Sequence, residues 1–148
     1  MKVLSNAVEV AEFMVAYAYN KEKPISNLQL QKILYFLWIE YYKKNQIYLF
    51  SEKFAAWLFG PVIPEVYYEF CAYGGLPITE SFEIDLKNDA AEKFIKHFVD
   101  KYSGADPFKM VAQSHQEGHA WDLIFNKDGK GTGNRTPIPF ELIIEKEC

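Results

Sequence analysis

The apolar residues of this chain recur mostly at intervals of three and four, which is the spacing of one face of an α-helix. The clearest of these segments follows Ser26, and its main apolar face carries Leu30, Ile33, Leu34, Leu37 and Tyr41. Ser26 and Gln29 have the spacing of a capping box, so we expect Ser26 to be the N-cap. Further apolar residues leave only a thin polar stripe on this helix, which indicates that it is central and covered on several sides.

The same spacing predicts several other helices. The first begins after Asn6, and Pro24 prevents it from continuing. Further helices are expected at residues 64–73, 89–102, 106–117 and 119–125. Two short segments are left undecided: residues 54–59 suit a strand or an extended connector, and residues 140–144 suit a strand or a last short helix. Gly60-Pro61 is typical of a turn between elements.

These elements define the expected fold class. We predict a mainly α protein, formed as a single compact bundle of five or six helices with at most a short strand pair. A chain of 148 residues has the length of one domain, and neither a linker nor an internal repeat divides it. Residues 1–148 are therefore expected to form one domain.

Composition and charge restrict the function. Hydrophobic residues make up 49% of the chain and charged residues 24%, as in globular proteins rather than disordered ones. The net charge is −4 and the only arginine is Arg135, so we do not expect nucleic acid as the main partner. Aromatic residues reach 17%, and this excess suits a protein-binding surface.

The chain is expected to reside in the cytoplasm, with no membrane partner. Its longest apolar run, residues 33–39, is far shorter than the roughly 20 residues that span a bilayer. The N-terminus lacks the pattern of a secretory signal, and two cysteines are too few for a disulfide framework.

His115 and His119 are the strongest candidates for catalysis. Two histidines four residues apart on one helix can bind the same metal ion, and with Glu117 they would form the site of a small metal-dependent hydrolase. However, Glu117 is not at the position that known zinc-binding motifs require, and Gly118 weakens the helix. The glycine-rich segment 129–133 lacks the spacing of a phosphate-binding loop. Taken alone, the residues favour an interaction module without a cofactor over an enzyme.

Three segments resemble the motifs of the Panacea (SocA-like) antitoxin domain family. The first is residues 25–36, with the sequence ISNLQLQKILYF. The second is Ala-Trp at residues 56–57, followed by FGPVIPEVY at residues 59–67. The third is Ser-His at residues 114–115, with Trp121 close behind. Their order and spacing agree with the family, the second is the most specific, and the resemblance covers nearly the whole chain.

The resemblance implies a mainly helical domain, found in bacteria and phages, that acts as an antitoxin and binds a toxin encoded beside it. It also implies an alternative, an adaptor that delivers its toxin to a protease. The family is not known for an enzymatic activity. Because the chain ends close to the end of the domain, we expect the domain's own surface to hold the toxin.

The predicted toxin-contact residues are Lys32, Tyr35, Phe36, Trp57 and Pro61. Lys32 and Tyr35 fall on the less apolar side of the second helix and are expected to be exposed. A Lys32→Glu change is therefore expected to leave the fold intact. For Trp57, as for Tyr67 and Trp121, packing in the core is an open alternative to contact with a partner.

Overall fold

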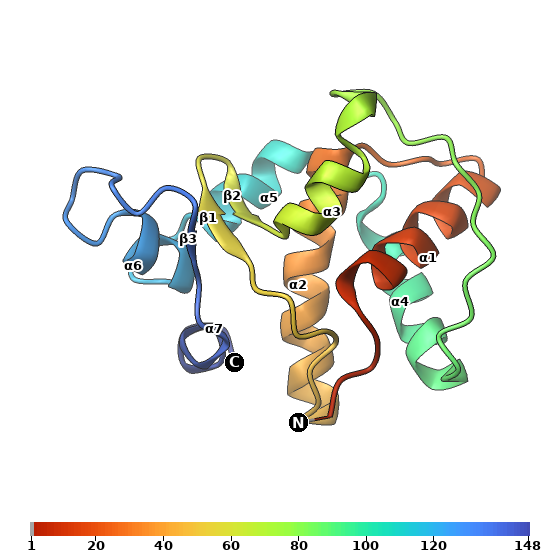
Figure 1. Cartoon of the computed structure of the whole chain (residues 1–148), viewed down its shortest axis with the longest axis horizontal. Helices are drawn as coiled ribbons and strands as arrows, with labels where there is room; N and C mark the ends of the chain where they lie inside the picture. Colours follow the sequence, from red (N-terminus) through yellow and green to blue (C-terminus); the bar gives the residue numbers. More distant parts are fainter. Residues whose placement is uncertain (1) are drawn as a thin grey trace.

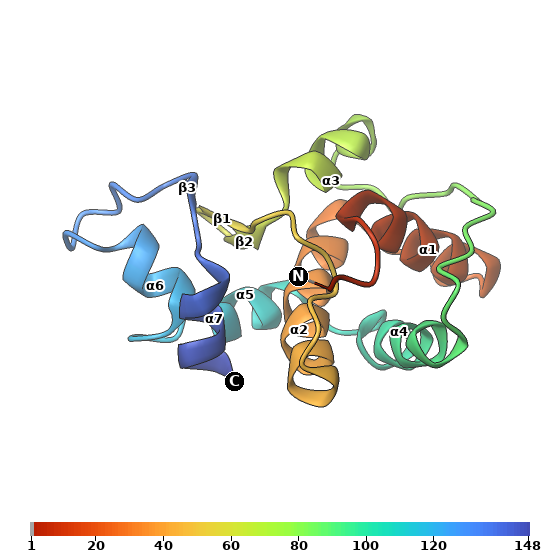
Figure 2. The same cartoon turned by 60° about the horizontal axis from the view of Figure 1, so that its bottom comes forward.

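The computed structural model describes residues 2–148, and its central element is the 19-residue helix α2 (Asn27–Asn45). Figures 1 and 2 show α1 (Ala7–Asn20) and α4 (Asp89–Tyr102) on one side of α2. The opposite side carries α6 (Ala120–Phe125) and α7 (Phe140–Glu147). The central position of this helix, predicted from its thin polar stripe, is confirmed.

The start of α2 follows from its sequence. The Ser26 hydroxyl oxygen accepts a hydrogen bond from the Gln29 backbone N–H at 3.2 Å, and Gln29 Oε1 accepts one from the Ser26 N–H at 2.9 Å. The predicted capping box is therefore confirmed. The apolar face of the helix is inaccessible to solvent at Leu30, Ile33, Leu34, Leu37 and Trp38. Burial of each large apolar side chain stabilises the fold by about 1.5–3 kcal/mol relative to exposure.

A small antiparallel sheet lies beside α2. Its strands are β1 (Ala55–Trp57), β2 (Gly60–Val62) and β3 (Thr136–Pro137), in the order β2-β1-β3. β1 and β2 form a hairpin that turns at Leu58 and Phe59. The turn therefore lies just before the predicted Gly60-Pro61 pair, which belongs to β2.

The helices that follow the hairpin are shorter than predicted. α3 (Pro64–Glu69) begins at the expected proline, but a separate 3₁₀ turn, η1 (Cys71–Tyr73), replaces its expected last turn. α5 (Pro107–Ser114) also ends before the predicted residue 117.

The last segment of the chain is a helix, α7, rather than a strand. The Phe140 ring at its start stacks on the Trp38 indole of α2, with 4.6 Å between ring centroids. The Trp38 Nε1–H donates to the Phe50 carbonyl at 3.3 Å. The local pattern left residues 140–144 open between strand and helix, and in the structure this segment is a helix that packs against α2.

The predicted mainly α class is confirmed. Residues 2–148 contain seven α-helices and a three-stranded sheet, where five or six helices and at most a strand pair were predicted. Within the same residues, no helix combines the length and the apolar character needed to cross a membrane.

Replacing Ser26 by alanine should lower the free energy of unfolding by about 1 kcal/mol, because it removes the N-cap oxygen and half of the capping box. The urea midpoint measures the loss. Ser51→Ala, at an exposed position outside the helices, is the control and should leave the midpoint unchanged. Equal midpoints for the two variants would contradict a stabilising cap at Ser26.

Candidate partner-binding site

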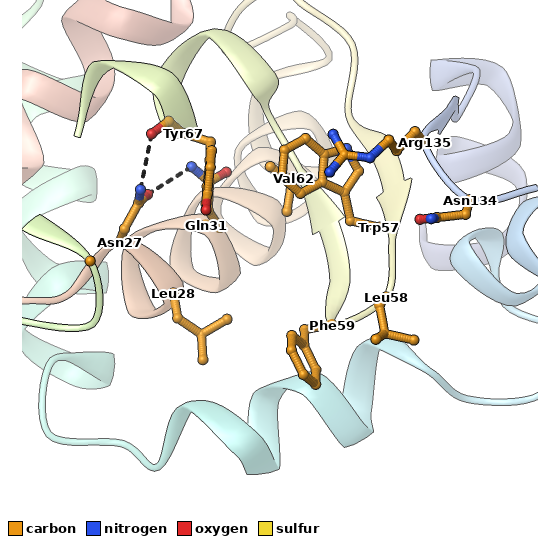
Figure 3. A pocket seen from close by; sticks show the side chains of 11 residues that line it. Asn27, Leu28, Gln31, Trp57, Leu58, Phe59, Val62, Tyr67, Asn134 and Arg135 are labelled. Atoms are coloured by element: carbon orange, nitrogen blue, oxygen red, sulfur yellow. Dashed lines mark hydrogen bonds between the residues drawn. The ribbon is translucent and has the colours of Figure 1, made fainter. Parts of the chain in front are cut away.

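Two buried amides of α2, Asn27 and Gln31, bond the chain that follows the hairpin. Asn27 Nδ2 donates to the Tyr67 carbonyl at 3.0 Å, and Gln31 Oε1 accepts from the Ile63 N–H at 2.9 Å. Gln31 Nε2 also donates to Asn27 Oδ1 at 3.2 Å, as Figure 3 shows. Buried polar groups need partners, so these bonds fix the end of the hairpin and α3 onto α2.

Lys32 completes this buried row, and the expectation that it is exposed is wrong. Its side chain is 0% exposed, and Nζ donates to the Pro61 carbonyl at 3.1 Å. Gly60 has φ +112°, and a Cβ atom there would lie 2.6 Å from Lys32 Nζ and 2.8 Å from Ser114 Oγ. Glycine therefore serves two needs at this position: it adopts the positive φ and leaves room for the lysine.

Burial also changes the protonation of Lys32. Loss of hydration lowers its pKa to about 7. The pKa of His115 is lowered mainly by burial and further by the charge of Lys32. The expectation that Lys32→Glu leaves the fold intact is therefore corrected: this change would bury a carboxylate and destabilise the fold.

The other predicted contact residues differ in exposure. Tyr35 is 1% exposed and packs edge-on against Phe54, with 5.1 Å between ring centroids, so its expected exposure is also wrong. Burial raises the pKa of the Tyr35 hydroxyl well above its usual value. Pro61 is buried, Phe36 is half-buried, and Trp57 is half-buried at the edge of a pocket.

The third family-like segment also meets the hairpin. The His115 ring stacks on the Trp121 indole with 3.6 Å between centroids. The Trp121 Nε1–H donates to the Trp57 carbonyl at 2.8 Å, across a sequence separation of 64 residues. All three segments that carry the family resemblance therefore converge on the β1–β2 hairpin.

The histidine pair does not form the arrangement that a metal site would need. His115 follows the last residue of α5, and His119 is the N-cap of α6, with Gly118 at φ +78° between them. His119 Nδ1 lies 2.7 Å from Glu147 Oε1 of α7. Across residues 2–148, no group of three or more His, Cys, Asp and Glu side chains is placed to hold a metal ion. The two histidines lie at the ends of different helices and have separate partners.

A pocket of about 330 Å³ opens beside the hairpin. Its apolar lining comes from α2, the hairpin and α3, and consists of Leu28, Trp57, Leu58, Phe59, Val62 and Tyr67. Arg135 and Asn134 close one side of it, as Figure 3 shows. The guanidinium carbon of Arg135 lies 4.2 Å from the centroid of the Trp57 ring, which is within the range of a cation–π interaction.

Sequence reasoning missed Leu58, Phe59 and Arg135. Leu58 and Phe59 are 60% and 54% exposed at the hairpin turn. Two adjacent large apolar residues in a turn were an available signal, because turns usually hold small or polar residues. Arg135 reaches the pocket because its backbone N–H bonds the Ala56 carbonyl next to β3. No local pattern indicates that pairing.

Comparison with known proteins confirms the family resemblance that the three segments carry. The family model described as "Antitoxin SocA-like, Panacea domain" matches residues 30–122. Antitoxin SocA of Caulobacter vibrioides (strain NA1000 / CB15N) is 31% identical, and the match covers 86% of this chain and 74% of that protein. This chain belongs to the SocA-like Panacea antitoxin family. No solved structure matches it.

Membership of the Panacea family supports an antitoxin role, and with it a toxin partner and a role other than catalysis. The residues that match the Panacea domain include Gln31 and Lys32, the whole hairpin and the stacked His115–Trp121 pair. Arg135 lies beyond the matched residues. Most of the hairpin's support therefore lies within the family match, whereas β3 and the Arg135 side of the pocket lie beyond it.

Replacing Lys32 by methionine should remove a pH dependence of stability. Between pH 7 and pH 9 the unfolded chain keeps a proton on Lys32 that the folded chain releases at a pKa of about 7, so stability rises with pH. The stability difference between the parent and Lys32→Met should shift in favour of the parent by up to about 1.4 kcal/mol per pH unit. His115, with its lowered pKa, titrates below this range. Urea unfolding at pH 7, 8 and 9 measures the difference, and a constant value would contradict the lowered pKa.

Replacing Gly60 by valine should destabilise the fold by about 2 kcal/mol or more, because a β-branched residue would be strained at this φ and would collide with Lys32 and Ser114. Gly104→Val is the matched control, since a Cβ atom there meets nothing within 4 Å. Thermal melting of both variants measures the effect. A Gly60→Val protein as stable as the control would show that the hairpin adjusts without strain.

Proposed function

We propose that this chain neutralises its toxin by direct contact, through the face formed by the hairpin turn and the adjacent pocket. The observation that carries the proposal is the exposure of Leu58 and Phe59, two large apolar side chains at the turn. Apolar side chains that gather on one exposed face are a common mark of protein interaction sites. The antitoxin family supplies the class of partner, a toxin protein.

The turn has a rigid support. β1 is paired on both sides, with β2 and with β3. The Lys32 amine donates a hydrogen bond to the Pro61 carbonyl of β2, and the Trp121 indole N–H donates one to the Trp57 carbonyl of β1. A surface that is already ordered loses little conformational entropy on binding, which favours affinity.

Aromatic side chains extend this face beyond the turn. The Trp57 ring meets the Tyr67 ring edge-on, with 4.9 Å between centroids. Tyr68 is exposed and lies 6.3 Å from Trp57 by the same measure. Large aromatic residues are the most frequent energetic anchors of protein interfaces, so Trp57 stays in the proposed contact surface.

The other four predicted contact residues do not belong to the proposed contact surface. Lys32 and Pro61 are buried and bonded to each other, so they position the hairpin without touching the toxin. Tyr35 is buried in the core, and Phe36 packs against that core. We therefore leave these four residues outside the contact surface.

The test is co-expression with the product of the gene beside this chain's own gene. The parent should restore growth and capture that product in a pull-down. Phe59→Ser should weaken the affinity about tenfold or more and reduce growth rescue, because it removes an apolar anchor. Phe108→Ser, at a residue of α5 that is 62% exposed and does not line the pocket, is the matched control and should behave as the parent.

Thermal melting verifies that both variants are folded. Full rescue by folded Phe59→Ser would contradict the proposed contact surface. A parent that neither rescues growth nor captures the neighbouring product would contradict neutralisation by contact. Rescue by the parent that disappears in a host without the relevant protease would indicate an adaptor for proteolysis instead.

A further inference from the structure

Arg135 has an unusual position at the rim of the pocket. Its φ is +68°, a left-handed backbone conformation that residues other than glycine seldom adopt. The residue is exposed, and one face of its guanidinium lies over the Trp57 indole. The ion pairs formed within residues 2–148 all involve other side chains. The charge of Arg135 therefore remains available to a partner.

The charge of the pocket differs from that of the chain. The chain has 20 acidic residues and a net charge of −4. Among the described residues that line the pocket, Arg135 is the one charged side chain, and none is Asp or Glu. Apolar walls such as Leu28 and Phe59 strengthen the field of a charge beside them. The pocket therefore favours a negative group that has an apolar neighbour.

The amides on the opposite side of the pocket are already bonded. Asn27 donates to the Tyr67 carbonyl, and Gln31 accepts from the Ile63 N–H. These side chains shape the pocket, and their bonds hold them in place. Figure 3 shows Arg135 and Asn134 on the side away from them, so recognition of charge falls to Arg135.

We infer that this pocket binds a segment of the toxin in which an Asp or Glu side chain lies next to a large apolar residue. The carboxylate accepts hydrogen bonds from the guanidinium of Arg135, and the apolar side chain enters between Leu28 and Phe59. The volume of about 330 Å³ lies at the lower end of small-ligand pockets, which span roughly 300–1,000 Å³, and suits an anchor residue. This inference rests on the proposed contact with the toxin and names its chemistry.

Arginine and lysine are not equivalent at this position. A guanidinium stacks its face on an indole while its edge offers two parallel N–H groups to a carboxylate. An ammonium group keeps the charge but lacks the planar fork. Arg135→Lys should therefore retain only part of the affinity.

The test uses the whole chain and the purified product of the neighbouring gene, with affinities measured by isothermal titration calorimetry. Arg135→Gln should weaken binding about tenfold or more, and Arg135→Lys should give an intermediate loss. Lys93→Gln, at an exposed lysine of α4, is the charge control and should stay within about twofold of the parent. Lys93→Gln should melt as the parent does, and the Arg135 variants should remain folded, with a melting temperature lowered by no more than the loss of the exposed contact with Trp57 explains.

A second series locates the carboxylate on the toxin. Each Asp and Glu of the toxin is changed in turn to Asn or Gln and tested against the parent and Arg135→Gln. One of these changes should weaken binding to the parent about tenfold but add little to the loss caused by Arg135→Gln, as coupled residues do.

The outcomes separate this inference from the proposal beneath it. The inference is overturned if Arg135→Gln binds the toxin within about twofold of the parent. It is also overturned if the effect of every Asp or Glu change in the toxin simply adds to the effect of Arg135→Gln. Neither result contradicts direct contact with the toxin. A parent that captures no toxin overturns both. Native mass spectrometry checks for other occupants of the pocket. A bound small molecule, or a dimer that Arg135→Gln abolishes, with toxin binding unchanged, would also overturn the inference.

Discussion

A row of buried hydrogen bonds between α2 and residues 61–67, which run from the end of the hairpin into α3, is the constraint on which the rest of this structure depends. It is formed by the side chains of Asn27, Gln31 and Lys32. Apolar burial is non-directional and would accept many placements of a short hairpin on a helix. A buried donor or acceptor that loses its partner costs about 1–3 kcal/mol. Any shift of the hairpin along α2 would break several of these bonds together, so the row fixes its position.

This constraint explains how an apolar turn stays exposed without collapsing onto the core. Leu58 and Phe59 lie at the end of a hairpin that is bonded from α2, from β3 and from Trp121. Gly60 allows the lysine to approach the strand, and the lysine in turn needs that approach to satisfy its amine. The buried hydrogen bonds therefore hold the hairpin in the position that keeps Leu58 and Phe59 exposed.

The Panacea match covers most of the residues that support the exposed face but not Arg135, the charged residue of the proposed contact. Residues 30–122 contain Lys32, the hairpin and the His115–Trp121 stack, which together support the face. Arg135 lies beyond them and comes to the pocket through the pairing beside β3. In our proposal the matched residues build most of the support, completed by Asn27 and β3, and Arg135 from outside the match contributes to recognition of the toxin.

The sequence by itself determined the features that arise within a few residues of one another. The capping box of Ser26 and Gln29, the apolar face of α2 and the mainly α class all follow from local spacing, and the motif segments identified the family. Tertiary structure alone decided whether a residue of the polar stripe is exposed or buried. Lys32 reads as a surface residue on an isolated helix, but its partner carbonyl lies 29 residues away in Pro61. The helical state of residues 140–147 and the placement of Arg135 over Trp57 likewise depend on groups distant in sequence. Periodicity records which face of a helix is polar, whereas burial of a polar group depends on whether the fold brings it a partner.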